Sequence, residues 1–119
     1  MLRLIRSVRY GLQGLTHVAC TEANMRWHLL ATVLVIVCGV TFQISLIEWA
    51  LVISCIGVML ALECVNTATE RLADQICSEE ATLIGQAKDA TAAAVLIMSI
   101  AAASIGGIIF LPKILMSLS

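Results

Sequence analysis

Glu63, Asn66, Glu70 and Asp74 form a polar series on a segment that otherwise has the composition of a membrane-spanning helix. On a helix these four side chains share one face about 80° wide. Ionisable groups at bilayer depth are costly and by default mark a functional site. Carboxylates this close together would also repel one another unless a cation lay nearby. We therefore expect a chemical role for this face, with a hydrogen-bonded seam between helices as the alternative.

The carboxylates of this face predict a magnesium site and a general base. Mg²⁺ prefers oxygen ligands, often one or two carboxylates together with substrate phosphates. Glu22 and Glu70 are the natural pair, because each belongs to one of two neighbouring helices. Glu63 lies two helical turns from Glu70, about 10 Å deeper, where the hydroxyl of a lipid headgroup would lie. We expect Glu63 to act as the base and substrate ligand, and Asn66 to orient that hydroxyl.

Lys88 and Asp89 directly precede the last apolar segment, so they place a cation where a nucleotide phosphate could reach it. A solvated helix cap is the alternative. The sequence has neither a P-loop nor a protein-kinase glycine loop, so a nucleotide site would be built from scattered side chains. Phosphoryl transfer mainly needs positioning, a bridging metal and charge neutralisation, and such a site can supply these.

The composition places the chain among integral membrane proteins. Of its 119 residues 61% are hydrophobic and 13% are charged, and the mean hydropathy is +1.02. This length supports a single domain over residues 1–119. The net charge of −1 with seven basic residues argues against a nucleic-acid partner. The five cysteines are scattered singly and indicate packing rather than a disulfide framework or a zinc site.

Residues 1–20 predict an amphipathic helix that lies on the membrane surface. Arg3, Arg6 and Arg9 interrupt any apolar core of a signal peptide. Apolar segments at about 24–44, 49–70 and 90–111 predict three transmembrane helices. The expected fold is therefore an all-α membrane protein with three transmembrane helices plus an N-terminal amphipathic surface helix.

The polar residues 71–89 are expected to form a water-facing connection, with Gly85 as a break between helices. The last span is expected to end at Pro112. Four arginines precede the first span and no basic residue lies in the turn at 43–48, so the N-terminus is expected in the cytoplasm. Glu22 and the Glu63–Glu70 face then approach the cytoplasmic side, where ATP and magnesium are found.

The pattern Glu63-x-x-Asn66-x-x-x-Glu70-x-x-x-Asp74, followed by Ala87-Lys88-Asp89 and preceded by Tyr10, Gly14 and Glu22, resembles the small bacterial membrane diacylglycerol kinase and undecaprenol kinase family. The resemblance runs from about Arg3 to the end of the third span. It implies an ATP- and Mg²⁺-dependent kinase of the bacterial plasma (inner) membrane that phosphorylates the hydroxyl of a lipid alcohol. It also implies a homotrimer with active sites shared between neighbouring subunits.

The resemblance also assigns roles to individual residues. Glu63 matches the base, Asn66 supports the lipid end, and Glu22 and Glu70 hold the magnesium that accompanies ATP. The residues implied at the nucleotide are Arg3, Tyr10, Glu22, Glu70, Glu79, Lys88 and Asp89.

His28 stands where diacylglycerol-specific enzymes of Gram-negative type carry a further glutamate, and in this respect the chain looks more like the undecaprenol kinase branch. The choice between undecaprenol and diacylglycerol stays open. From its position alone, His28 is expected to have an interfacial rather than a catalytic role. Thr67 and Thr69 are expected to bond to backbone carbonyls one turn back.

Two other functions use the same features. A proton or ion carrier could use the carboxylate face as a relay, but it would need acidic residues across the whole membrane depth. A non-catalytic assembly subunit could use the alanines to pack helices, but it would leave the acidic face without a purpose.

Overall fold

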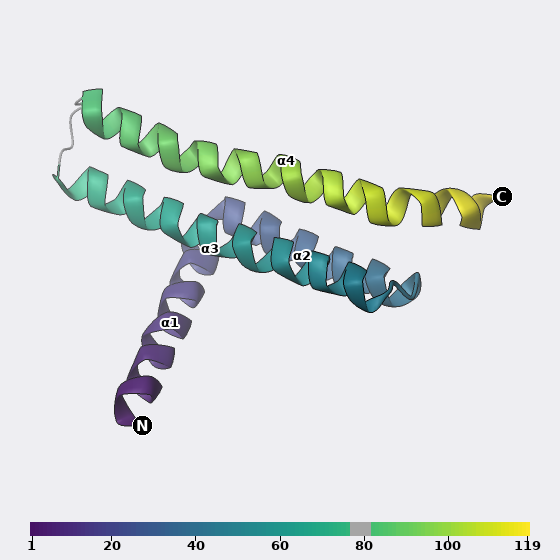
Figure 1. Ribbon diagram of the computed structural model, residues 1–119. Coiled ribbons are helices and arrows are strands. Elements are labelled where there is room, and N and C mark those ends of the chain that lie inside the picture. The colour runs from purple at the N-terminus through teal and green to yellow at the C-terminus, as the bar shows by residue number, and fades with distance from the viewer. Residues whose placement is uncertain (77–81) are drawn as a thin grey trace.

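The computed structural model describes residues 1–76 and 82–119, and within these ranges the chain folds into four helices. They are α1 (Leu2–Thr21), α2 (Ala23–Thr41), α3 (Leu46–Ile76) and α4 (Thr82–Leu118). Figure 1 shows α2, α3 and α4 running alongside one another, while α1 projects away from them. The expected all-α membrane fold with three spans and an N-terminal amphipathic helix is confirmed. Glu79 lies outside the described residues.

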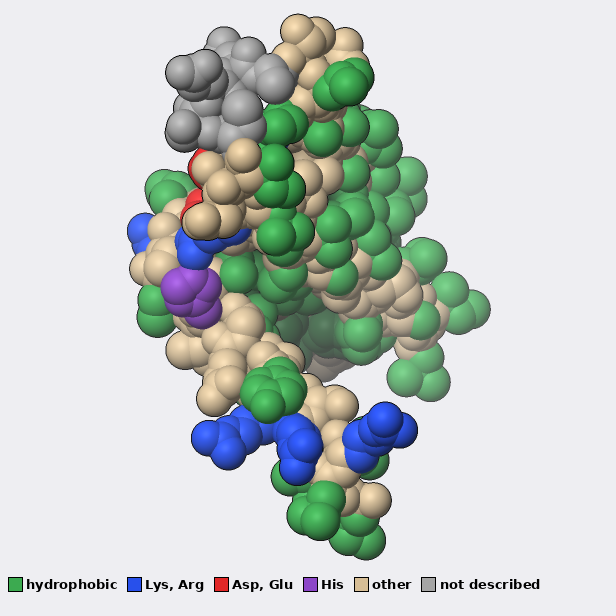
Figure 2. All heavy atoms as spheres, turned by 90° about the vertical axis from the view of Figure 1, so that its left-hand side faces the viewer, with side chains coloured by type: hydrophobic (Ala, Val, Ile, Leu, Met, Phe, Trp, Pro, Cys, Tyr) green, Lys and Arg blue, Asp and Glu red, His purple; other side chains and the backbone are tan. Residues whose placement is uncertain are grey.

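Three of these helices are long and apolar enough to cross a membrane. α2 has 19 residues, α3 has 31 and α4 has 37. At 1.5 Å per residue even α2 extends about 28 Å, close to the thickness of a bilayer's hydrocarbon core. Large apolar side chains remain exposed along all three helices, and Figure 2 shows them over much of the surface above α1. Such a surface suits a lipid or protein environment rather than water.

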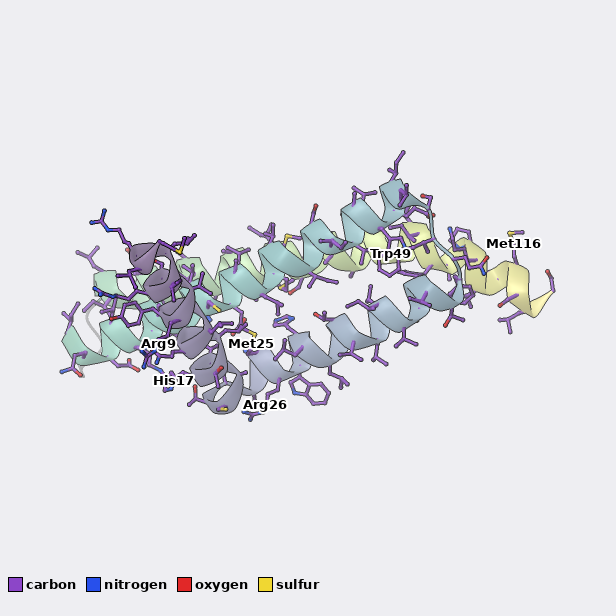
Figure 3. All side chains as sticks on the ribbon, turned by 90° about the horizontal axis from the view of Figure 1, so that it is seen from below. Arg9, His17, Met25, Arg26, Trp49 and Met116 are labelled. Atoms are coloured by element: carbon purple, nitrogen blue, oxygen red, sulfur yellow. The ribbon has the colours of Figure 1, made fainter. Side chains whose placement is uncertain are left out.

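Glu22 alone separates α1 from α2, and its extended backbone (φ −110°, ψ 118°) turns the chain between them. The guanidinium of Arg26 donates to the carbonyl oxygens of Ala19 and Cys20, at 3.2 and 3.0 Å. These contacts satisfy carbonyls that the end of a helix leaves without partners. A sharp elbow is thereby fixed, and Figure 3 shows Arg26 at this end of the structure.

The turn between α2 and α3 carries a capping box. The Ser45 N–H donates to Glu48 Oε1 at 3.0 Å, and the Glu48 N–H donates to Ser45 Oγ at 3.2 Å. Gln43 takes the left-handed conformation, with φ 52°, that reverses the chain. Lys113 Nζ lies 2.9 Å from Glu48 Oε2, so the start of α3 is tied to the last turns of α4.

A small apolar core lies at this same end of the bundle. It contains Ile44, Val52, Ile109 and Phe110. Trp49 packs beside it, at the turn end of α3 in Figure 3, and lies over Gly39 of α2. A Cβ at position 39 would lie 2.6 Å from the Trp49 ring, so only glycine allows this approach.

One expectation about helix ends is wrong. Gly85 does not break a helix but lies inside α4, which begins at Thr82. Glycine costs only about 1 kcal/mol against alanine in a helix, too little to end one that good helix formers continue. Pro112, the expected end of the last span, lies inside α4, and the helix continues to Leu118. The ion pair of Lys113 with Glu48 holds the turn that follows the proline. The segment 71–89 is accordingly helical at both of its ends.

Candidate active site

The polar face of α3 points into the protein at its deep end. Glu63 is 1% exposed, Asn66 8% and Thr67 4%, and these are the buried polar side chains among the described residues. They lie three and four residues apart, so a single helix places all of them on one face. Further along α3 Glu70 is partly buried and Asp74 is exposed. The face therefore leads from a buried end at Glu63 to an open end at Asp74.

Three buried atoms on this face have no hydrogen-bond partner within the described part of the chain. They are Glu63 Oε2, Asn66 Oδ1 and Thr67 Oγ1. Leaving a buried polar group unpaired costs about 1–3 kcal/mol. The expectation that Thr67 bonds back to its own helix is therefore wrong, whereas Thr69 does so, donating to Val65 O at 2.9 Å. The three unpaired atoms are free to meet a polar ligand.

His28 lies against the deepest of these groups. Its Nε2 is 3.6 Å from Glu63 Oε2, and its side chain is 22% exposed. The expectation of a purely interfacial role missed this contact, because the two residues belong to different helices. A sequence signal for this contact is the break at Glu22. After it the chain enters α2, which runs alongside α3 and carries His28 in its second turn.

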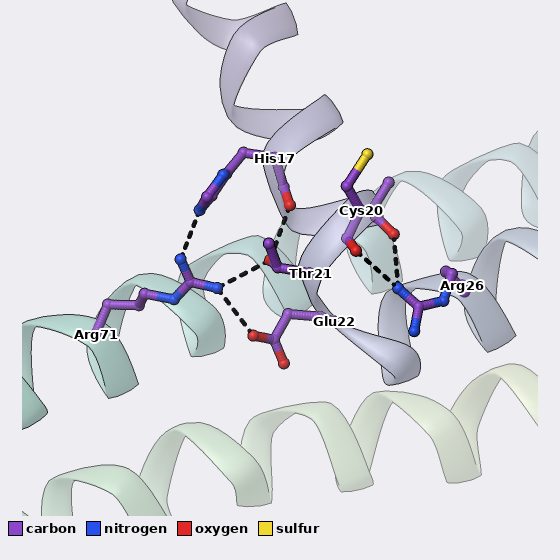
Figure 4. Close-up of polar contacts among 7 residues, drawn as sticks. His17, Cys20, Thr21, Glu22, Arg26 and Arg71 are labelled. Carbon is purple, nitrogen blue, oxygen red and sulfur yellow. Dashed lines mark hydrogen bonds and ion pairs between the residues drawn. The ribbon is translucent and has the colours of Figure 1, made fainter.

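Glu22 contacts α3 through a residue that the sequence did not single out. Arg71 Nη2 lies 3.1 Å from Glu22 Oε1 and donates to Thr21 Oγ1 at 2.9 Å. The same guanidinium also bonds His17 Nε2, and Figure 4 shows these contacts converging at the elbow. Since Arg71 directly follows Glu70 in the chain, the elbow lies beside the Glu70 turn of α3.

Glu22 and Glu70 have donor chemistry that fits a magnesium ion. Glu22 lies at the elbow beside the Glu70 turn of α3, and Glu70 lies two helical turns from Glu63 on the same helix. Among the described residues no three His, Cys, Asp or Glu side chains gather into a complete metal cage. Magnesium needs no such cage, because one or two carboxylates together with water and substrate phosphates complete its octahedron.

Lys88 reaches the open end of the polar face. Its Nζ lies 2.8 Å from Asp74 Oδ1 across the α3–α4 pair. Lys88 is thereby turned towards α3, and its neighbour Asp89 is exposed. The structure thus adds a cation to the acidic face from a second helix.

Arg3 and Tyr10 lie on α1 and are exposed. Figure 2 shows the basic side chains of α1 gathered on the part that projects below the other helices. In the described ranges no hydrogen bond or ion pair joins either side chain to the α3 face. A single chain therefore does not bring these two residues to Glu63.

A cavity of about 350 Å³ lies between α2, α3 and α4, and His28 forms part of its wall. Most of the lining is apolar. Two hydroxyls in the wall are already used, because Thr32 Oγ1 donates to His28 O and Ser99 Oγ donates to Val95 O, both at 2.8 Å. The cavity is therefore apolar, with a titratable ring on its wall.

Comparison with known proteins identifies the family to which this chain belongs. Residues 9–110 match the family described as prokaryotic diacylglycerol kinase. The undecaprenol kinase of Bacillus subtilis (strain 168) is 38% identical over 112 residues, covering 94% of this chain and 91% of that protein. The diacylglycerol kinase of Escherichia coli (strain K12) is 35% identical over 100 residues, covering 84% and 82%. That of Haemophilus influenzae is 34% identical over 111 residues, covering 92% and 94%. The chain belongs to the prokaryotic diacylglycerol kinase family of ATP-dependent lipid kinases, and it is a multi-pass membrane protein.

Proposed function

We propose that this kinase transfers the γ-phosphoryl group of ATP to the hydroxyl of a membrane lipid alcohol at the buried end of the α3 face. The observation that carries the proposal is Glu63, a carboxylate 1% exposed whose Oε2 has no hydrogen-bond partner among the described residues. A carboxylate oxygen that accepts no hydrogen bond can take the proton of a hydroxyl that enters beside it. The apolar cavity next to His28 offers space for a lipid chain.

In this proposal Glu63 acts as the general base. The lipid oxygen attacks the γ-phosphorus while its proton passes to the Glu63 carboxylate. The bond from the γ-phosphorus to the bridging oxygen breaks, and its electron pair leaves with ADP. Asn66 is buried one turn away, and its amide N–H donates a hydrogen bond to the lipid oxygen and holds the headgroup in line.

Glu22 and Glu70 hold a magnesium ion in this proposal. When it is bound, the ion neutralises charge on the ATP phosphates and orients them. The role is supported by the position of Glu22 at the elbow and of Glu70 on the helix that carries Glu63.

Lys88 contacts the phosphates from the open end of the face, and Asp89, Glu79, Arg3 and Tyr10 complete the nucleotide site. Because Arg3 and Tyr10 lie on the projecting α1, they reach that site in a homotrimer whose sites combine neighbouring subunits. The exposed apolar faces of the long helices are consistent with such an assembly. The N-terminus and the end of the bundle that carries Glu22 and Glu70 lie on the cytoplasmic side, in agreement with the positions of the arginines.

We propose undecaprenol as the lipid. Diacylglycerol carries two ester carbonyls directly beneath its hydroxyl, and buried carbonyls need hydrogen-bond donors. The hydroxyl protons of Thr32 and Ser99 are already donated to backbone carbonyls, so the cavity wall offers neither to an ester. A polyprenyl chain makes no such demand. The relative from Bacillus subtilis is an undecaprenol kinase.

The test is lipid phosphorylation by the purified protein in lipid nanodiscs, with radiolabelled ATP and either undecaprenol or diacylglycerol. Glu63→Gln should reduce turnover by about 100-fold or more, the range expected for loss of a general base. Glu48→Gln is the matched control, because glutamine preserves a capping box and the residue lies at the far end of α3. Near wild-type turnover of Glu63→Gln would overturn the base assignment, and faster turnover of diacylglycerol would overturn the choice of lipid.

A further inference from the structure

A buried base must lose its proton before it can act again. Each phosphoryl transfer to a lipid hydroxyl leaves one proton on Glu63, which is 1% exposed and so has little access to water. Proton loss therefore needs a neighbour that can accept the proton. This inference rests on the proposed role of Glu63 as the base.

His28 is the basic side chain that the structure pairs with Glu63. Its Nε2 lies 3.6 Å from Glu63 Oε2, the carboxylate oxygen without a hydrogen-bond partner among the described residues. The side chain of His28 is 22% exposed against 2% for Glu63. The ring is therefore less buried than the carboxylate, and it lies in the second turn of α2, near the elbow. Histidine is also the side chain that exchanges protons most readily near neutral pH.

The other groups near Glu63 are less suited to this task. Glu70, two turns along α3, and Glu22, at the elbow, are both assigned to the metal. Arg71 is bound to Glu22, and an arginine already carries its full set of protons. Lys88 is paired with Asp74 at the open end of the face.

We propose that His28 takes the proton from Glu63 after each transfer and passes it to water. In this step the O–H bond on the Glu63 carboxyl breaks and an N–H bond forms at His28 Nε2, so a carboxylate and an imidazolium result. The imidazolium then releases its proton to water. The net result is the one proton that kinase turnover produces, and Glu63 is again a carboxylate.

This role predicts a specific kinetic signature in His28→Gln. Glutamine keeps a polar group at the site but cannot carry a proton at neutral pH. The first turnover, which precedes any return of a proton from Glu63, should keep its wild-type rate, whereas steady-state turnover should fall about tenfold or more. Rapid-quench measurements on lipid nanodiscs should therefore show a burst of one phosphorylated lipid per active site, followed by slow turnover.

Chemical rescue provides the second arm of the test. Because the His28 ring forms part of the wall of the 350 Å³ cavity, His28→Ala extends that cavity by the space of one imidazole. Added imidazole should restore the steady-state rate of His28→Ala and leave the first turnover unchanged. Trp27→Phe serves as the control, since Trp27 is the exposed neighbour of His28 on α2. It should show neither the burst nor a response to imidazole.

Three outcomes would overturn the proposal. One is steady-state turnover of His28→Gln within about twofold of wild type. Another is a first turnover slowed as much as the steady state, which would make His28 a positioning residue only. The last is a defect in His28→Ala that imidazole does not change although the protein elutes and melts like wild type. The first-turnover rate of Glu63→Gln tests the role of Glu63 as the base, independently of the role of His28 in proton transfer.

Discussion

Arg71 binds Glu22 across the elbow, with 3.1 Å between Nη2 and Oε1, and so a guanidinium occupies one oxygen of a proposed metal ligand. Arg71 lies on α3, and Glu22 is the residue that joins α1 to α2. The contact lies on the elbow side of the acidic region formed by Glu22, Glu63 and Glu70. Figure 4 shows that the same guanidinium also bonds His17 and Thr21.

Arg71→Gln should strengthen metal binding. The guanidinium competes with the cation for Glu22, and an ion pair of partly exposed groups is worth about 0.2–1 kcal/mol, or up to about fivefold in affinity. Binding of Mn²⁺ as a probe, followed by electron paramagnetic resonance without ATP, should show this increase. Arg26→Gln is the control, because the Arg26 guanidinium at the same elbow bonds carbonyl oxygens. Unchanged or weaker Mn²⁺ binding by Arg71→Gln would contradict the competition.

Glu22→Gln and Glu70→Gln should each raise the magnesium concentration needed for half-maximal activity by about tenfold or more. Each change removes one charged oxygen ligand from a site that has two. Magnesium titration of lipid phosphorylation and Mn²⁺ binding provide two independent measurements. Glu48→Gln should leave both at their wild-type values. If the metal dependence of either variant matches wild type, that residue is not a ligand.

Thr67→Val should show whether the Thr67 hydroxyl takes part in lipid binding. Thr67 Oγ1 is buried without a hydrogen-bond partner among the described residues, so an isosteric methyl should leave thermal stability unchanged or raise it. If the hydroxyl contacts the lipid headgroup, the KM for lipid should rise about threefold to tenfold. Thr69→Val, which removes a bond to Val65 O, is the matched control. An unchanged KM would exclude Thr67 from the lipid site.

Gly39→Ala should destabilise the α2–α3 pair by about 1–3 kcal/mol, the usual cost of overpacking. The added Cβ would lie 2.6 and 2.8 Å from two atoms of the Trp49 ring. A lower melting temperature in detergent is expected, with recovery in the double variant Gly39→Ala/Trp49→Leu. Gly57→Ala, where nothing lies within 4 Å, should be neutral. Equal melting temperatures for Gly39→Ala and wild type would show that the ring moves aside at no cost.

Lys113→Met should loosen the far end of the bundle without affecting chemistry. Its ion pair with Glu48 is partly buried and joins α4 to the first turn of α3. The melting temperature of this variant in detergent should fall, and a double-mutant cycle with Glu48→Gln isolates the pair from the capping box. Turnover in nanodiscs should stay at the wild-type value. A coupling energy of zero would mean that the pair does not stabilise the fold.

The helical period explains why much of the site could be predicted from sequence. Spacings of three and four residues place Glu63 and Asn66 on one face whatever the surroundings. The three spans could be predicted for the same reason, because length and hydropathy are local properties.

Pairings between helices could not be predicted in this way, because they depend on how the helices pack. Lys88 binds Asp74 on another helix rather than its neighbour Asp89. The contact of His28 with Glu63 likewise depends on the angle between α2 and α3. One helix end was also poorly predicted, since Gly85 is locally unfavourable in a helix but is outweighed by the residues around it.

The elbow has a mechanical consequence for the acidic region. With one residue between α1 and α2, no linker is present to absorb a change in the direction of α1. Any tilt of α1 must be taken up by the φ and ψ angles of Glu22, the residue whose side chain meets Arg71. The depth at which the amphipathic α1 rests in the membrane is thus coupled directly to the position of a single carboxylate.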